Sequence, residues 1–183
     1  MTISRACKTG VTLAVVLAPI LALASLARAA PRETPSGLPA PRMGPSGLMV
    51  PRYLSLKFDT VNARAGPGDD YRALWTYRAK GLPVQVVAET RDWRRLCDPQ
   101  GRQGWVKATG VSGQRTALNL APRPLPLRRG PRSGAGIAAY LAPRALADLK
   151  RCKAGWCKLS LPGASGWAPA SALWGADDKA QCR

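Results

Sequence analysis

From Tyr53 onward, hydrophobic residues occur in short runs in which they alternate with polar ones. In the two clearest runs every second residue is apolar: Leu54, Leu56 and Phe58, and later Leu82, Val84 and Val86. A period of two puts one face of a strand in the core and the other in solvent, so these runs predict half-buried strands. Glycine and proline at 66–68, 81, 99–101 and 104 separate the runs at intervals typical of turns. The pattern therefore predicts an antiparallel, all-β fold.

The one strong helical pattern lies near the N-terminus, where residues 11–26 form an apolar run. Arg5 and Lys8 precede this run, and a small-x-small tripeptide follows it at 27–29. These are the parts of a secretory signal peptide. An uncleaved membrane anchor is the alternative, but the run has 16 residues and contains Pro19, whereas a spanning helix needs about 20 apolar residues.

We therefore predict a signal peptide over residues 1–29 that is cleaved between Ala29 and Ala30. The mature chain is then periplasmic or secreted, and no transmembrane anchor is expected in it. Removing the leader takes away three cations and no acid, so the formal net charge falls from +18 to +15. Such a charge attracts polyanions, which outside the cytoplasm means anionic cell-wall polymers or lipid headgroups sooner than nucleic acid. Scattered arginines that serve solubility alone are the alternative explanation.

The segment 30–52 is dense in proline and glycine, and the tetrapeptide at 35–38 recurs at 45–48. Such a composition without apolar periodicity predicts an extended, semi-rigid linker. A proline-rich ligand for a partner, or for this protein's own domains, is the alternative.

Three anchors of the sequence recur in the same order 62 to 64 residues further on. The Gly-Pro pair at 66–67 returns at 130–131, Trp93 returns as Trp156, and the Gly-Trp pair at 104–105 returns at 166–167. This repeat predicts two tandem β domains, at 53–115 and 117–175, followed by a tail at 176–183. Each domain is close to the lower size limit for a self-sufficient core.

The cysteine count becomes even once the leader is removed. Four cysteines then remain: Cys97, Cys152, Cys157 and Cys182. An even set in an oxidising compartment predicts disulfides. Cys152 and Cys157 flank a turn-like tetrapeptide and are expected to pair across a hairpin, which leaves Cys97 and Cys182 either bonded to each other or free. A four-cysteine zinc site is disfavoured because its single C-x4-C half has no partner half, and no metal or other cofactor is expected.

The sequence contains no histidine, which excludes the Ser-His-Asp and Cys-His catalytic arrangements and imidazole ligation of zinc. The ten acidic residues form no clear catalytic pair. Asp69-Asp70 and Asp177-Asp178 are adjacent in sequence, and neighbouring residues on a strand point to opposite faces. No catalytic residue is assigned, and we do not expect an enzyme.

The motifs of the first copy resemble those of the bacterial SH3-like (SH3b) domain family. This copy opens with Asn62-x-Arg64-x-Gly66-Pro67 and closes with Gly104-Trp105-Val106. The second copy departs from the pattern at three positions and is expected to be degenerate: Pro126, Leu127 and Ala168. The resemblance implies two tandem small SH3-like β-barrels, in which Arg64 braces the glycine turn with hydrogen bonds.

The same resemblance implies an exported, non-catalytic binding module that recognises cell-wall peptidoglycan or peptides in the envelope. SH3-type domains hold ligands in shallow, aromatic-lined grooves. The candidate ligand-binding residues are Tyr71, Trp75, Tyr77 and Trp93 in the first copy, with Trp156 and Trp174 in the second. Of the aromatics, Tyr71 is the one most expected to be exposed, whereas Trp93, Trp105 and Trp167 suit a core better than a groove. The alternative function is a protein-interaction scaffold that uses its proline-rich arm or an envelope partner.

Overall fold

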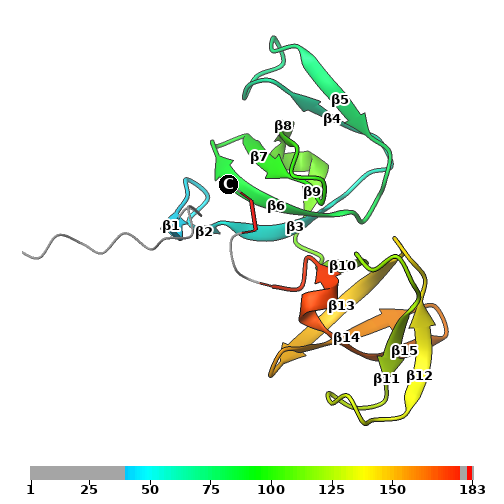
Figure 1. The fold of residues 1–183 in the computed structure, drawn as a ribbon. Helices are drawn as coiled ribbons and strands as arrows, with labels where there is room; N and C mark the ends of the chain where they lie inside the picture. Colours follow the sequence, from blue (N-terminus) through cyan, green and yellow to red (C-terminus); the bar gives the residue numbers. More distant parts are fainter. Residues whose placement is uncertain (1–39, 178–180, 183) are drawn as a thin grey trace, which may run out of the picture. The chain divides into compact units, whose positions relative to one another are not determined.

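The computed structural model describes residues 40–177, 181 and 182, which contain strands and two short 3-10 helices (Figure 1). The predicted signal peptide, its cleavage site at Ala29 and Ala30, and part of the predicted linker lie outside the described residues. Two seven-stranded antiparallel sheets hold nearly all the strands; we call residues 52–112 the first domain and residues 116–174 the second. The prediction of an all-β fold is confirmed.

The first domain consists of seven strands and one 3-10 helix. They are β3 (Arg52–Leu56), β4 (Val61–Arg64), β5 (Ala73–Tyr77), β6 (Pro83–Glu89), β7 (Trp93–Cys97), β8 (Gln103–Lys107), the helix Ala108–Gly110 and β9 (Val111–Ser112). The strand order in the sheet is β5-β4-β8-β7-β6-β3-β9.

The second domain repeats this arrangement element by element. Its elements are β10 (Thr116–Asn119), β11 (Leu125–Arg128), β12 (Ile137–Leu141), β13 (Leu146–Lys153), β14 (Trp156–Leu161), β15 (Ala164–Pro169), the helix Ala170–Ala172 and β16 (Leu173–Trp174). The order is β12-β11-β15-β14-β13-β10-β16, which is the order of the first sheet with every strand replaced by its counterpart. The repeat detected in the sequence is therefore a repeat of topology.

The recurring Gly-Trp pair is explained by a close approach between two strands. A Cβ on Gly166 of β15 would lie 2.7 Å from the Cβ of Leu127 and 2.9 Å from its carbonyl carbon on β11. In the first domain, a Cβ on Gly104 would lie 3.0 Å from the Cβ of Ala63. Glycine lets the closing strand approach the opening strand at this distance, so the sheet can bend over its own core.

The core of the first domain forms on one face of β6, but the opposite face is buried as well. Val84 and Val86 belong to the hydrophobic core of the first domain and have no exposed surface. Gln85, between them, is also 0% exposed, because its Oε1 accepts hydrogen bonds from the backbone N–H groups of Gln181 and Cys182. The prediction that this strand is half-buried was wrong, since the C-terminal segment covers its polar face.

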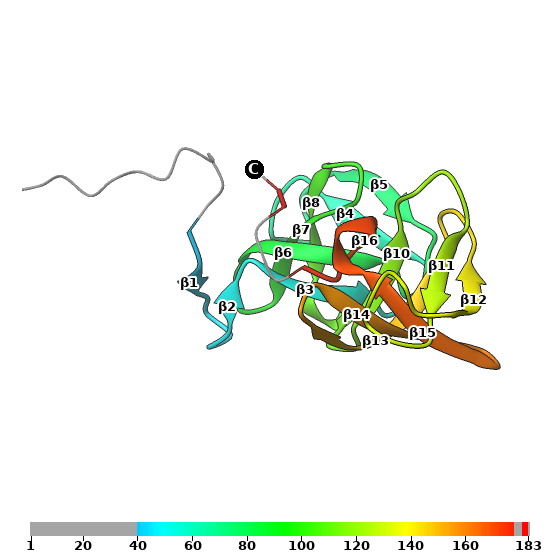
Figure 2. The same ribbon diagram turned by 60° about the horizontal axis from the view of Figure 1, so that its bottom comes forward.

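A small aromatic cluster joins the two domains. The indole of Trp174 on β16 meets the ring of Tyr53 edge-on at 5.4 Å between centroids, and its Nε1 donates to the carbonyl of Pro83 at 2.8 Å. Thr116 Oγ1 donates to the carbonyl of Gly81 at 2.6 Å. Figure 2 shows β10 and β16 beside β6, and β10 contacts β6. Each domain thus buries part of its surface against the other.

A short hairpin precedes the first domain within the segment that was predicted to be a linker. β1 (Arg42–Met43) pairs with β2 (Met49–Val50), and β2 contacts β6. The carboxylate of Glu89 on β6 holds this hairpin through hydrogen bonds from the backbone N–H and the hydroxyl of Ser46. Arg52 and Arg94 form ion pairs with the same carboxylate at 2.6 and 3.1 Å.

Burial by itself would raise the pKa of the Glu89 carboxyl. The hydrogen bonds from Arg52 and Ser46 and the charge of Arg52 outweigh burial and hold that pKa below its usual value. Glu89 is therefore ionised at neutral pH, and its charge organises the hairpin.

Two disulfides are present. Cys152 and Cys157 are directly opposed on β13 and β14 and form a bond across that hairpin, as predicted. Cys97 at the end of β7 is bonded to Cys182, which ties the C-terminal segment to the first domain across a sequence separation of 85 residues. The sequence left this second pair either bonded or free, and the structure shows it bonded.

Candidate functional site

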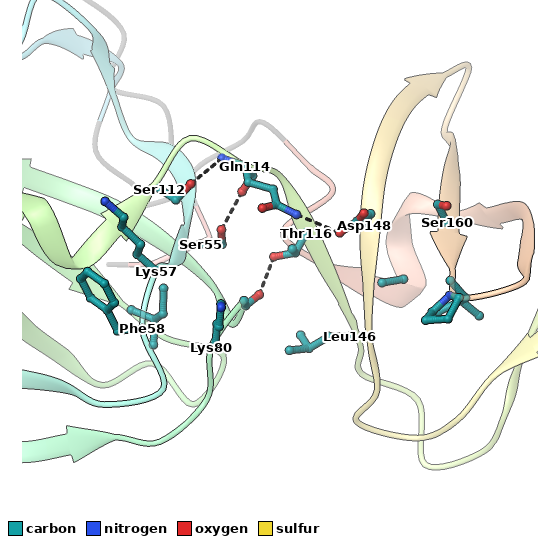
Figure 3. A pocket seen from close by; sticks show the side chains of 15 residues that line it. Ser55, Lys57, Phe58, Lys80, Ser112, Gln114, Thr116, Leu146, Asp148 and Ser160 are labelled. Carbon is teal, nitrogen blue, oxygen red and sulfur yellow. Dashed lines mark hydrogen bonds between the residues drawn. The ribbon is translucent and has the colours of Figure 1, made fainter.

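A groove of about 890 Å³ lies where residues of both domains face each other (Figure 3). We call it the inter-domain groove. The first domain contributes the segment Ser55–Phe58, Lys80 and Ser112, the connecting segment 113–115 contributes Gln114, and the second domain contributes Leu146, Asp148 and Ser160. Its lining is a mixture of polar and apolar side chains, which suits a ligand with both kinds of group.

The connecting segment fixes the two walls of this groove to each other. The Ser55 hydroxyl donates to the carbonyl of Gln114 at 2.7 Å, and the Gln114 side-chain amide donates to Asp148 Oδ1 at 3.1 Å. The backbone N–H of Gln114 donates to the hydroxyl of Ser112 at 3.2 Å. Gln114 therefore bridges a residue of the first domain and a residue of the second, as Figure 3 shows.

The charges of the groove are separated. Lys57 and Lys80 lie on the side of the first domain, and both are exposed. Asp148 lies on the side of the second domain, where Lys150 forms an ion pair with it at 3.1 Å. A ligand that carries a carboxylate at one end and an amine at the other matches this arrangement, because each end would meet the opposite charge.

Phe58 is the exposed aromatic residue of the groove. Half of its surface is exposed, and the Lys57 Nζ lies 5.4 Å from the centroid of its ring. Phe58 also lines a second hollow of about 270 Å³ that contains Trp93 and Lys107, so it borders both hollows. An exposed phenyl ring in such a position offers a ligand a flat apolar contact.

Phe58 was not among the candidates from the sequence. The alternation with Leu54 and Leu56 placed it on the core face of a strand, but β3 ends at Leu56 and leaves Phe58 outside the sheet. The polar pair Asp59-Thr60 that follows Phe58 is the one local signal of a turn at this position.

The smaller hollow is built on the first domain. Trp93 is only 8% exposed there, and the Lys107 Nζ lies 5.8 Å from the centroid of its ring. Asp69 pairs with Lys107 at 2.7 Å and with Arg64 at 3.7 Å. The expectation that Trp93 is largely buried agrees with this exposure, and the indole contributes one partly covered wall.

Tyr71 is exposed, at 45% of its surface, as expected. Its ring lies against Gly66, where an added Cβ would fall 2.3 Å from the ring carbons. The Arg64 guanidinium donates to the carbonyl of Tyr71 at 2.8 Å, so Arg64 does brace this turn. Tyr71 does not line either hollow.

Trp75 and Tyr77 pack against each other on β5 rather than facing a groove. Their rings meet edge-on at 5.8 Å between centroids, and the Arg102 guanidinium lies over both rings. Tyr77 is buried, and burial together with the Asp98 carboxylate raises the pKa of its hydroxyl. Trp75 is half-buried against the segment at Gly104. These two residues stabilise the first domain in this conformation.

The two candidates in the second copy lie in different places. Trp174 is buried in the aromatic cluster between the domains, whereas Trp156 is half-buried on β14 near the tip of the disulfide-bonded hairpin. Trp167 is buried and Trp105 is half-buried. The structure therefore does not gather the six predicted aromatics at one site, and a ligand role for any of them stays a prediction.

Among the described residues, no group of three or more cysteine and acidic side chains is placed to hold a metal ion. The described part of the chain also contains no helix that is long and apolar enough to span a membrane.

No curated protein matches the chain. The solved structures that match include two from Trichomonas vaginalis: NlpC2, with 11% identity and a TM-score of 0.31, and NlpC1, with 10% identity and a TM-score of 0.30. Each match covers 68% of this chain, which spans only 48% and 45% of the respective structures. Scores this low do not establish a shared fold, so the fold rests on the sheet order described above.

The sequence pattern of the bacterial SH3 domain matches the chain twice, over residues 57–113 and 121–175. These two matches fall on the two sheets and together cover more than half of the chain. The protein belongs to the bacterial SH3 domain family and contains two tandem copies of that domain.

Proposed function

We propose that this protein is an exported, non-catalytic binding module that holds peptidoglycan or a peptide of the cell envelope in the inter-domain groove. The observation that supports this most directly is the groove itself, which combines two exposed lysines, one carboxylate and the exposed ring of Phe58. Peptides cross-linked to glycans carry amines, carboxylates and apolar side chains, and each finds a partner of the right chemistry on these walls.

The two disulfides support a location outside the cytoplasm, because such bonds persist in oxidising compartments. The predicted signal peptide agrees with a periplasmic or secreted protein. The family matches are to the bacterial SH3 domain alone, and the proposal includes no chemical step.

Retention on purified peptidoglycan sacculi tests the proposal, followed by titration with a soluble muramyl peptide. The protein purified after export should sediment with sacculi at physiological salt. Phe58→Ala should weaken binding of the muramyl peptide by about tenfold, since it removes an exposed aromatic contact of the kind that often dominates binding. Tyr140→Ala is the matched control, because Tyr140 is exposed on β12 and lines neither hollow.

Two results would contradict the proposal. The first is a wild-type protein that stays in the supernatant with sacculi. The second is a Phe58→Ala variant that binds the muramyl peptide as tightly as the wild type.

A scaffold function is the second candidate, and the docked hairpin at 42–50 favours it. This part of the proline-rich arm already binds the first domain through Glu89. Under the scaffold hypothesis, Glu89→Gln should release the arm and change the oligomeric state measured by light scattering. Under the groove hypothesis, the same variant should leave muramyl-peptide binding within twofold of the wild type.

A further inference from the structure

A row of three cations and one indole crosses four neighbouring strands of the second domain. The register of the sheet pairs Arg128 on β11 with Trp167 on β15, Trp167 with Lys158 on β14, and Lys158 with Arg151 on β13. Directly paired residues of antiparallel strands share one face of the sheet. These four side chains therefore stand side by side on a single face.

The next row toward the hairpin tip continues this face. Lys153 on β13 pairs with Trp156 on β14, and Trp156 pairs with Pro169 on β15. We call the surface formed by Arg128, Arg151, Lys153, Lys158, Trp156 and Trp167 the basic sheet face. Arg151 and Lys153 are exposed, and Lys158 and Arg128 are half-buried.

An indole lies beneath the cations of this face. The guanidinium of Arg151 lies 5.5 Å from the centroid of the Trp167 ring. Trp167 is largely covered, so stacking holds Arg151 over the sheet while its donors remain available to a ligand. The flat guanidinium presents paired N–H groups that match the oxygens of a phosphate.

The charge of the basic sheet face is not neutralised by neighbouring acids. Within residues 116–174 the chain has nine Lys and Arg and a single acidic residue, Asp148. Asp148 is paired with Lys150 at the end of the sheet near the groove. Across the described ranges no carboxylate forms an ion pair with Arg151, Lys153 or Lys158.

The first domain has the same row but not the same charge. There Arg64 pairs with Trp105, Trp105 with Arg95, and Arg95 with Ala88. Ala88 thus occupies the position of Arg151, and Arg64 is paired with Asp69. The first domain also has six acids within residues 52–112, against one in the second domain. The row without a neutralising carboxylate is a property of the second copy.

The disulfide fixes the strands that carry these cations. Cys152 and Cys157 lie in the register between the Arg151–Lys158 pair and the Lys153–Trp156 pair. The cations are therefore held in position before a ligand arrives, which lowers the entropic cost of binding.

We infer that the basic sheet face binds a linear polymer with repeating phosphate groups. Neighbouring strands are separated by about 4.8 Å, so a chain that crosses β13 and β14 meets a new cation at each strand. This site is distinct from the inter-domain groove, and it uses the copy whose sequence departs most from the family motif. A polymer, rather than a single phosphate, is required because the cations lie on three strands, β11, β14 and β13, with Trp167 on β15 between them.

Long-chain inorganic polyphosphate is the probe for this inference, with the anisotropy of a labelled chain as the signal. The wild type should bind it at low salt and lose most of its affinity between about 50 and 500 mM salt, because screening weakens exposed charges. The double variant Arg151→Gln/Lys153→Gln should bind at least tenfold more weakly. Arg72→Gln/Arg78→Gln is the matched control, since it removes two exposed arginines from the first domain, and it should bind within about twofold of the wild type.

Equal weakening by both double variants would overturn the inference, because net charge alone would then account for binding. Tighter binding to vesicles of anionic phospholipid than to polyphosphate would overturn it as well. Near-ultraviolet circular dichroism checks that each variant is folded, and Lys158→Gln provides an independent test in the same row. Phe58→Ala should leave polyphosphate binding unchanged, so a failure of this inference is distinguishable from a failure of the groove proposal.

Discussion

The disulfide between Cys97 and Cys182 should contribute more to stability than the one in the hairpin, and the difference follows from the length of chain that each closes. The first closes a loop with a sequence separation of 85 residues, and the second closes one of 5. Loop-closure entropy grows with the logarithm of this length, which gives about 4.5 kcal/mol for the long loop and about 2 kcal/mol for the short one.

Contacts beside the long-range disulfide reduce this difference only in part. The Tyr53 hydroxyl donates to the side-chain oxygen of Gln181, and Gln85 accepts from the backbone N–H of Gln181. These hydrogen bonds survive in the variant Cys97→Ala/Cys182→Ala, but they must then hold the C-terminal segment without a covalent link. We expect that variant to lose about 3–4 kcal/mol of unfolding free energy.

Equilibrium unfolding in guanidinium chloride, followed by tryptophan fluorescence, measures both disulfides. The matched control is Cys152→Ala/Cys157→Ala, which should lose about 2 kcal/mol or less. Because Trp174 lies in the cluster that joins the domains, the transition of Cys97→Ala/Cys182→Ala should also broaden or divide into two. The reasoning is refuted if the hairpin variant loses as much stability as the long-range variant, or if the latter loses less than about 1 kcal/mol.

Three further changes test separate contacts. Glu89→Gln should lower the free energy of unfolding by about 3 kcal/mol, because the guanidinium groups of Arg52 and Arg94 lose their carboxylate. The pKa of Glu89 is lowered in the folded state, so its stabilisation is present above pH 4.5, the usual value, and is lost as the pH falls through the folded-state value. Thermal unfolding measured over a pH series should therefore show a steeper loss of stability in acid for the wild type than for the variant. Gly175→Ala should lower the free energy of unfolding, measured by chemical denaturation, by about 2–4 kcal/mol. The φ of Gly175 is +93°, and an added Cβ would lie 2.7 Å from both the Cβ of Pro83 and the carbonyl oxygen of Thr116. A loss below about 0.5 kcal/mol would contradict this expectation. Trp174→Phe should cost about 1–3 kcal/mol in the same assay, because the carbonyl of Pro83 loses its donor, and an unchanged midpoint would show that this hydrogen bond is dispensable.

The sequence predicted the fold well because the fold depends on local patterns that occur twice. Alternating apolar residues and the Gly-Trp pairs are local signals within one domain. Each signal alone is weak evidence for a β domain, but both recur in the second copy, and the repetition makes the prediction specific. The six aromatic candidates could not be sorted in this way. Whether Tyr77 is buried beside Asp98 or Trp174 is buried against Tyr53 depends on contacts between segments that are distant in the sequence.

Two individual residues show where periodicity misleads. Gln85 has the sequence position of a solvent-facing residue, but the C-terminal segment returns over 96 residues to cover it. Phe58 continues an apolar alternation, but its strand has already ended at Leu56. In both cases the alternation correctly predicts a strand, but it identifies neither the segment that covers the polar face of β6 nor the residue at which β3 ends.

The two surfaces proposed for binding differ in what holds them together, and this difference follows from the size of the domains. A domain of about 60 residues buries only a small core and offers little surface for a ligand site. Such a site is therefore formed either by one face of a single domain or by residues of two neighbouring domains together. The basic sheet face is formed by four strands of the second copy and is stiffened by its own disulfide. The inter-domain groove exists only where Ser55, Gln114 and Asp148 connect the two copies. It is therefore a property of the pair, which explains why motifs that identify each copy separately do not locate it.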